Sequence, residues 1–339
     1  MAGISTGSLR EQREEAERAW LSPFAAKPWE SRGREMGEEP HPYRSAFQRD
    51  RDRILHSKAF RRLGHKTQVF LAPEGDHYRV RLTHTLEVAQ VARTIARALR
   101  LHEDLAEAVC LGHDLGHTPF GHLGEEVLTE YLGRPFRHNE QSLRIVERLE
   151  GGEGGRPGLN LTWEARDGIL NHTWSMPPPS TLEAQVARLA DRIAYVNHDI
   201  DDALRAGVLE PRDLPDRTRR TLGDTSSGRI DTMVSSVVEA SLGAQRVGMG
   251  AEVLEVLLET RRFLFERVYL RPEVRSEHER ARTLLRTICD HYRRHPEALP
   301  GPSGDDPEPR LIDYVAGMTD RFARREYERI VAGGGGADA

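Results

Sequence analysis

Cysteine is scarce in this sequence, because the 339 residues contain only Cys110 and Cys289. Two cysteines are too few for a disulfide framework or a cysteine-rich zinc site, so a bound metal would have to be held by histidine and carboxylate side chains. Long apolar runs are also missing, since no stretch approaches the roughly 18 to 20 consecutive apolar residues of a membrane span. The segment 1–18 is polar and charged where a secretory signal would be apolar. We therefore expect a cytoplasmic protein with no membrane partner.

The net charge of -5 gives no reason to expect tight, sequence-independent binding of nucleic acid by the whole molecule. Lysine is nearly missing as well, with only Lys27, Lys58 and Lys66, and arginine supplies the rest of the 49 basic residues. The segment 44–62 is locally basic. It is either a solvated basic helix face or a surface for single-stranded nucleic acid, and the sequence leaves both interpretations open.

Helical periodicity predicts an all-α fold of about a dozen helices. Helical patterns cover the ranges 45–63, 83–99, 105–115, 122–132, 138–150, 162–171, 181–206, 228–241, 248–268, 274–294 and 308–331. Strand-like alternation is weak and confined to 66–71 and 78–82. The expected organisation is an N-terminal arm over 1–40 that is helical or partly disordered, a single helical domain over 41–332 with its core at about 80–205 and C-terminal helices at 228–332, and a disordered tail over 333–339.

Histidine is concentrated in one region, with six of the 15 histidines between His84 and His138. The block CLGHDLGHTPFGH at 110–122 begins at the end of an apolar run and contains a His-Asp pair followed by two more histidines. Core packing does not require these histidines. Adjacent His113 and Asp114 can both ligate one divalent cation. His84 is a candidate third ligand. An acidic residue on the helix predicted at 181–206 would complete the set.

That later helix offers suitable acids, because Asp191, Tyr195 and Asp199 are four residues apart and share one face, with Arg192 alongside. A solvated helix face is the alternative interpretation of these residues. The order of His84, His113-Asp114 and Asp191 resembles the H, HD and D of the HD-domain phosphohydrolases. The blocks around these residues, over about 40–210, further resemble the deoxynucleoside triphosphate triphosphohydrolases, often called dGTPases.

The resembling blocks are RDRILHSKAFRRLGHKTQVF at 51–70, RLTHTLEVAQVAR at 81–93, HDLGHTPFGHLGEE at 113–126, FRHNEQSLRIVERLE at 136–150 and LEAQVARLADRIAYVNHDIDDA at 182–203. The resemblance implies the helical HD fold and one divalent metal ion per subunit. Its implied ligands are His84, His113, Asp114 and Asp191. Mg or Mn is expected first, and Fe, Co, Ni or Zn is also compatible with imidazole and carboxylate ligands.

The resemblance also implies catalytic roles for four residues. The resemblance places His122 near the α-phosphate, with its imidazole oriented by Glu125, so that this pair acts on the attacking water. His117 and His138 bind phosphate or assist proton transfer. The implied substrate-binding residues are Gln68 for the deoxyribose and Arg81, Arg192, Tyr195 and Asp199 for the phosphates and sugar, with Tyr195 excluding a 2'-hydroxyl.

The implied activity is metal-dependent hydrolysis of dGTP or several dNTPs to deoxynucleoside and inorganic triphosphate. The chemistry agrees, because a metal and arginines offset the phosphate charge and a histidine can return a proton to the leaving 5'-oxygen. No Walker loop is present, which argues against a P-loop enzyme. An HD phosphohydrolase for nucleoside monophosphates or cyclic nucleotides is one alternative, although it leaves Gln68, His122 and Tyr195 without a task. A non-catalytic protein that binds dNTPs or single-stranded nucleic acid is another.

Assembly and regulation are less constrained by the sequence. The resemblance and the long amphipathic helices at 248–268 and 274–294 predict a homo-oligomer, a dimer or a dimer-based hexamer. The preferred dNTP, the need for an activating second dNTP and the physiological metal stay open.

Overall fold

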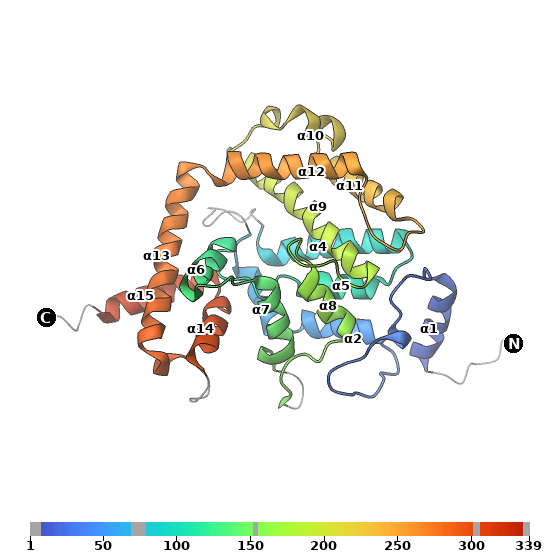
Figure 1. Ribbon diagram of the computed structural model, residues 1–339, viewed down its shortest axis with the longest axis horizontal. Helices are drawn as coiled ribbons and strands as arrows, with labels where there is room; N and C mark the ends of the chain where they lie inside the picture. Colours follow the sequence, from blue (N-terminus) through green and yellow to red (C-terminus); the bar gives the residue numbers. More distant parts are fainter. Residues whose placement is uncertain (1–7, 69–78, 152–154, 301–305, 335–339) are drawn as a thin grey trace.

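The computed structural model describes residues 8–68, 79–151, 155–300 and 306–334 (Figure 1). Within these ranges it contains fifteen α-helices and no strand beyond isolated bridges, which confirms the predicted all-α class. The helices are α1 (Leu9–Trp20), α2 (Ala46–Leu55), α3 (Lys58–Arg62), α4 (Arg81–Ala98), α5 (Glu103–Gly112), α6 (His122–Leu132), α7 (His138–Arg144), α8 (Trp163–Asn171), α9 (Leu182–Arg205), α10 (Asp216–Thr221), α11 (Ser226–Ser241), α12 (Ala251–Leu264), α13 (Pro272–Arg294), α14 (Pro307–Ala316) and α15 (Asp320–Gly334). None of them is long and apolar enough to cross a membrane.

The main hydrophobic core forms where α4, α5 and α9 pack together, with α2, α8, α11 and α12 around them (Figure 1). On α4, the fully buried Val88, Ala92 and Ile95 recur at helical spacing and face this core. The side chain of Thr181 caps α9 by accepting a hydrogen bond from the amide of Ala184. These three central helices fix the position of every predicted metal ligand.

A second hydrophobic cluster lies between α6, α13, α14 and α15, which Figure 1 places together at the end of the molecule nearest the C-terminus. Leu123 and Val127 of α6 pack there with Leu285 and Ile288 of α13. The predicted single domain over 41–332 therefore contains two separate cores. Helix α6 belongs to the second core, because it packs along α13, and it begins at His122 of the predicted site.

Several predicted elements differ in detail. The pattern at 45–63 is divided into α2 and α3 at Ser57, whose side chain accepts a hydrogen bond from the amide of Phe60 and starts a new helix. The pattern at 308–331 is divided into α14 and α15 at Gly317–Thr319. The strand-like prediction at 66–71 and 78–82 is wrong for its described part, since only a Thr67–Val80 bridge forms and Arg81 already belongs to α4. Residues 69–78 and 335–339 lie outside the described residues.

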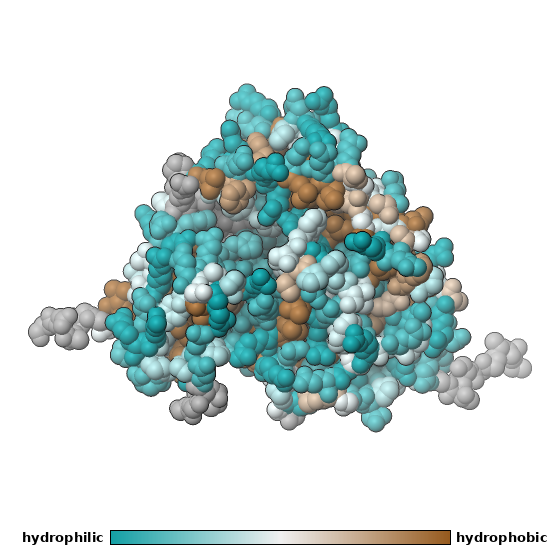
Figure 2. Space-filling model, viewed as in Figure 1, coloured by the Kyte–Doolittle hydropathy of each residue, from teal (hydrophilic) through white to brown (hydrophobic). Residues whose placement is uncertain are grey.

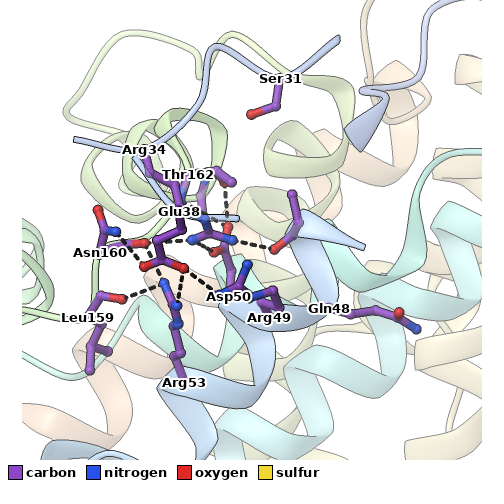
Figure 3. Close-up of polar contacts among 12 residues, drawn as sticks. Ser31, Arg34, Glu38, Gln48, Arg49, Asp50, Arg53, Leu159, Asn160 and Thr162 are labelled. Atoms are coloured by element: carbon purple, nitrogen blue, oxygen red, sulfur yellow. Dashed lines mark hydrogen bonds and ion pairs between the residues drawn. The ribbon is translucent and has the colours of Figure 1, made fainter. Parts of the chain in front are cut away.

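The predicted N-terminal arm contributes helix α1 and an extended segment in which Arg34 and Glu38 contact residues of α2 (Figure 3). Arg34 donates to the buried Asp50 carboxylate at 2.5 Å and to the Asn160 carbonyl at 2.6 Å. The Glu38 carboxylate accepts hydrogen bonds from Arg49 and Arg53, both on α2. Charge pairing with α2 thus holds a segment that has little apolar periodicity of its own.

The face seen in Figure 2 is mostly hydrophilic, with apolar side chains interspersed in the upper band where Figure 1 places α12. Leu258 on α12, and Phe265 and Leu270 in the segment that follows this helix, are exposed large apolar residues.

Candidate functional site

The four predicted metal ligands come from three helices that meet in the main core. His84 lies in the first turn of α4, His113 and Asp114 follow the end of α5, and Asp191 lies in the middle of α9. His84 Nε2 is 3.2 Å from Asp191 Oδ1, and His113 Nε2 is 3.8 Å from the same oxygen. His113 Nε2 is also 3.3 Å from Asp114 Oδ1. The fold therefore brings the four side chains to one place, where Asp191 is the most accessible with 29% of its side chain exposed.

The hydrogen bonds of the two histidines suit a metal. His113 Nδ1 lies 2.6 Å from the Cys110 carbonyl, which fixes its proton on Nδ1. His113 Nε2 is buried and has no hydrogen-bond partner among the described residues, so its lone pair is free for a cation. His84 Nδ1 lies 3.1 Å from His198 Nδ1, which leaves Nε2 facing Asp191. A ligand histidine whose other nitrogen is held by the protein is the usual arrangement at metal sites.

The two carboxylates are held in the charged form that ligates a cation. Burial alone would raise the pKa of Asp114, but the imidazoles of His113 and His117 and the Arg81 guanidinium hold it well below its usual range. Burial likewise opposes the charge on Asp191, and its hydrogen bond with His84 lowers its pKa below the ordinary value. The donor set thus fits one divalent metal ion on the chemistry of the residues present.

A second group adjoins the first and contains the four predicted catalytic residues. Glu125 Oε1 lies 2.9 Å from His138 Nδ1, 3.0 Å from His117 Nδ1 and 3.4 Å from His122 Nδ1. The His117 and His138 rings stack with centroids 4.1 Å apart. His122 is 62% exposed, whereas the other three side chains are largely buried. Glu125 therefore contacts three histidines, and His122, which it is predicted to orient, is the most distant of them.

The environments of these groups push their pKa values apart. Burial lowers the pKa of His117 well below its usual range, and the Arg81 charge adds to this effect. Burial would also lower the pKa of His138, but the adjacent Glu125 carboxylate raises it above the ordinary value. Two neighbouring imidazoles, one held neutral and one favoured in the charged form, are typical of acid and base pairs.

Among the predicted substrate residues, Arg81 contacts one of these groups directly, and Gln68 lies beside the loop that leads to His122. Gln68 has a buried Oε1 without a hydrogen-bond partner among the described residues, and its carbonyl approaches Gly121. The Arg192 guanidinium lies 4.7 Å from the centroid of the Trp174 ring. Arg81 donates to Asp114 Oδ2 at 2.8 Å, so the structure pairs this predicted phosphate-binding residue with a predicted metal ligand.

The other two predicted sugar contacts are joined by a residue that the sequence interpretation missed. Tyr269 donates to Asp199 Oδ2 at 2.9 Å, and its hydroxyl lies 2.8 Å from the hydroxyl of Tyr195. Burial raises the pKa of Asp199 well above its usual range. Tyr269 is 70 residues from Asp199, so no local spacing could have indicated it.

Three further residues at the site were also missed. His172, after α8, has its Nε2 3.2 Å from His138 Nε2, and burial together with His113 lowers its pKa to about 3. His198 supports His84, and its position seven residues after Asp191 on α9 was a usable signal. Lys66 is buried beside the loop that carries His117, and burial together with Arg62 lowers its pKa to about 7.

Comparisons with known proteins show the family of this chain. The HD domain matches residues 81–196, and the phosphohydrolase-associated domain matches residues 247–329. A deoxyguanosinetriphosphate triphosphohydrolase-like protein of Caldanaerobacter subterraneus subsp. tengcongensis is 54% identical over 327 residues, 95% of each chain. This chain belongs to the dGTPase-like family of HD-domain proteins. Proteins with the same description from Desulfatibacillum aliphaticivorans and Clostridium perfringens are 47% and 46% identical over 95% of this chain and 98% and 97% of theirs.

Membership of the dGTPase-like family makes this chain a phosphohydrolase with the all-α HD fold. HD domains are metal-dependent, and the described residues include a His/Asp cluster that could bind a metal. A solved phosphohydrolase from Bacteroides thetaiotaomicron matches with a TM-score of 0.52 and 18% identity, over 80% of this chain and 66% of that one. At this identity the likeness concerns the fold alone.

Proposed function

We propose that this chain hydrolyses deoxynucleoside triphosphates to deoxynucleoside and inorganic triphosphate in a metal-dependent reaction in the cytoplasm. The observation that carries the proposal is that the predicted metal ligands adjoin the predicted acid-base group. Asp114 Oδ1 lies 3.3 Å from His113 Nε2 on one side and 3.6 Å from His117 Nε2 on the other. A phosphate held at this junction would contact both groups. The Caldanaerobacter relative is named a deoxyguanosinetriphosphate triphosphohydrolase-like protein, which supports the same substrate class.

His84, His113, Asp114 and Asp191 would hold one divalent ion. When bound, such an ion supplies positive charge that stabilises the phosphate oxygens as charge develops on them. Mg and Mn suit this role, and Fe, Co, Ni or Zn is compatible with the same ligands.

The chain's own acid-base groups would move the protons. His122 is the exposed imidazole of the group, so it can reach a water molecule on the substrate side. Glu125 orients the imidazoles around it. His138, whose pKa is raised by Glu125, can carry a proton for the leaving 5'-oxygen, which needs one because an alkoxide is a poor leaving group.

The selectivity for deoxyribose would come from Gln68 and from Tyr195 and Asp199. A buried amide oxygen without a partner, as in Gln68, is suited to accept a hydrogen bond from the sugar. Tyr195 is fixed by Tyr269, so its ring has little freedom to make room for a 2'-hydroxyl. Arg192 and Arg81 would contact the phosphates.

The test is incubation of the purified protein with each dNTP and with Mg or Mn, followed by anion-exchange separation of triphosphate from pyrophosphate and phosphate. We expect deoxynucleoside and triphosphate in equal amounts. Pyrophosphate with a nucleoside monophosphate would overturn the proposed reaction. Turnover of monophosphates or cyclic nucleotides alone would favour the alternative HD phosphohydrolase, and binding without turnover would favour a binding protein.

Asp114→Ala tests the proposed metal ligands. Because Asp114 joins the two groups, its loss should abolish both turnover and bound metal, measured by elemental analysis. Full metal occupancy in this variant would contradict the proposed ligand set.

A further inference from the structure

The C-terminal helical unit, defined here as α13–α15, is joined directly to the loop at 113–121, which carries His117 and leads into α6, where His122 and Glu125 lie. Asp320, the first residue of α15, makes part of this connection. Its Oδ1 accepts a hydrogen bond from the amide of Phe120 at 2.9 Å, and its Oδ2 accepts one from the amide of Thr67 at 2.9 Å. Asp320 is only 7% exposed. One buried carboxylate thus holds two backbone segments that are far apart in the sequence.

Lys66 makes the other part of the connection. Its Nζ donates to the carbonyl of His117 and, at 2.9 Å, to the carbonyl of Ala316 at the end of α14. The side chain is 1% exposed, so these carbonyls take the place of water around the ammonium group. Lys66 and Asp320 together tie residues 66–67 and 117–120 to residues 316–320.

The loop at 113–121 needs such support because its backbone has an unfavourable conformation at Phe120. Phe120 has a φ of +60°, which an aromatic residue rarely adopts, and Gly121 follows with a φ of +63°. A Cβ at Gly121 would lie 2.9 Å from Arg81 Nη2, so the loop approaches Arg81 closely. The Phe120 ring is buried in the second core, and its amide is held by Asp320. Holding the amide and the ring fixes the direction in which the chain continues.

The two amides that Asp320 holds lie beside two predicted functional residues. His122 begins α6 two residues after Phe120. Gln68 directly follows Thr67. A displacement of either amide would therefore move a group that the proposed reaction uses. No interaction of Asp320 with the four predicted metal ligands is found among the described residues, so its effect on them is indirect.

We propose that Asp320 is a positioning residue, through which the C-terminal helical unit sets the geometry of His122 and Gln68. This assignment rests on the proposed function for the roles of those two residues. The C-terminal helical unit, most of which lies within the phosphohydrolase-associated domain, then has a direct part in the site, because it holds the loop in its strained form.

The test compares Asp320→Ala and Asp320→Asn with the control Asp306→Ala in the full-length protein. Asp306 is also a carboxylate at the start of a helix of the same unit, where it caps α14 by accepting from the amide of Glu308. Removing the Asp306 side chain should weaken the cap of α14 without removing a contact to the loop at 113–121. We expect Asp320→Ala to lower kcat about 10- to 100-fold, the scale for small misplacements of reacting groups, with unchanged metal content. Asp320→Asn keeps one acceptor oxygen and should recover part of the loss.

Asp306→Ala should keep the wild-type kcat even if its Tm falls. A folded Asp320→Ala protein with wild-type kcat and KM would overturn the proposal, and so would a loss of activity that follows Tm equally in all three variants. If Asp320→Ala does not fold, Asp320→Asn supplies the measurement.

Hydrogen exchange gives a readout that does not depend on activity. The amides of residues 117–122 should exchange faster in Asp320→Asn than in the wild type or in Asp306→Ala, while amides of α4 and α9 stay protected. Unchanged exchange in this loop would refute the positioning role. Lack of dNTP hydrolysis by the wild-type protein would instead refute the proposed function. Hydrogen exchange and turnover thus distinguish a failure of the positioning role from a failure of the proposed function.

Discussion

Replacing Glu38 by Gln tests whether charge pairing fastens the N-terminal arm to α2. The Glu38 carboxylate accepts hydrogen bonds from Arg49 and Arg53 at 2.5 Å each and from Asn160 at 2.6 Å (Figure 3). It also accepts one from Arg156 at 2.8 Å. Burial alone would raise its pKa, but Arg53 and Asn160 lower it from 4.5 to about 2. Because the folded pKa is below the unfolded value, the carboxylate stabilises the fold above about pH 4.5, and this contribution is lost as the pH falls towards 2.

The size of the effect follows from the shift. At about 1.4 kcal/mol per pKa unit, a fall from 4.5 to about 2 corresponds to roughly 3 kcal/mol. Glu38 itself is 8% exposed, but its arginine partners keep 18% to 33% of their side chains in solvent. Solvent screening of such pairs reduces the expected contribution to about 1 to 2 kcal/mol. Glu38→Gln should lower the free energy of unfolding by this amount at pH 7.

Urea unfolding at pH 7, 5 and 4 measures the difference between the variant and the wild type. The difference should be nearly constant from pH 7 to 5 and smaller by roughly 0.8 kcal/mol at pH 4, where Glu38 of the unfolded chain is mostly protonated. Glu35→Gln is the matched control, because Glu35 lies in the same segment and makes an exposed pair with Arg148 at 3.2 Å. This control should change stability by less than about 0.5 kcal/mol. Equal effects of the two substitutions, or no pH dependence for Glu38→Gln, would refute the reasoning.

Three further predictions concern activity and assembly. His122→Ala should lower kcat about 100-fold, as expected for the loss of a general acid or base. The variant should keep its Tm and its metal content because the His122 side chain is exposed. Wild-type turnover in a metal-loaded variant would remove His122 from the mechanism. GTP should be hydrolysed far more slowly than dGTP because the fixed Tyr195 ring excludes a 2'-hydroxyl, and similar kcat/KM values for both nucleotides would contradict this. Light scattering at micromolar concentration should give a dimer or hexamer, since Phe265 and Leu270 expose apolar area, whereas a monomeric mass would exclude the proposed assembly.

Much of the helical architecture could be predicted from local patterns. Helix α6 begins at His122 and ends at Leu132, as the periodicity predicts, and α9 lies within one residue of its predicted range. The errors occurred where apolar periodicity continues across a capping residue. Ser57 accepts a hydrogen bond from the amide of Phe60, which starts α3, but the apolar pattern is uninterrupted there.

The residue types of the candidate site were readable in the sequence, but their partners were not. Asp191 and His198 lie on one helix, so helical spacing alone relates them. The Arg81 guanidinium, which is predicted to bind phosphate, donates a hydrogen bond to the Asp114 carboxylate, because the start of α4 packs against the end of α5. Glu125 contacts His138 more closely than His122 because α7 brings a second element to the same carboxylate.

The family, the helical class and the set of imidazole and carboxylate groups could be recognised from the amino-acid sequence, because they depend on residue identity and on spacings of three or four residues. The contact of Asp320 with the amide of Phe120, 200 residues earlier, and the link from Tyr195 through Tyr269 to Asp199 became visible in the folded chain alone. Helical periodicity specifies which face of a helix is buried, but many packings satisfy the same apolar faces. The packing that forms is chosen by the complementarity of whole helices, and that complementarity places the polar groups that meet at the site.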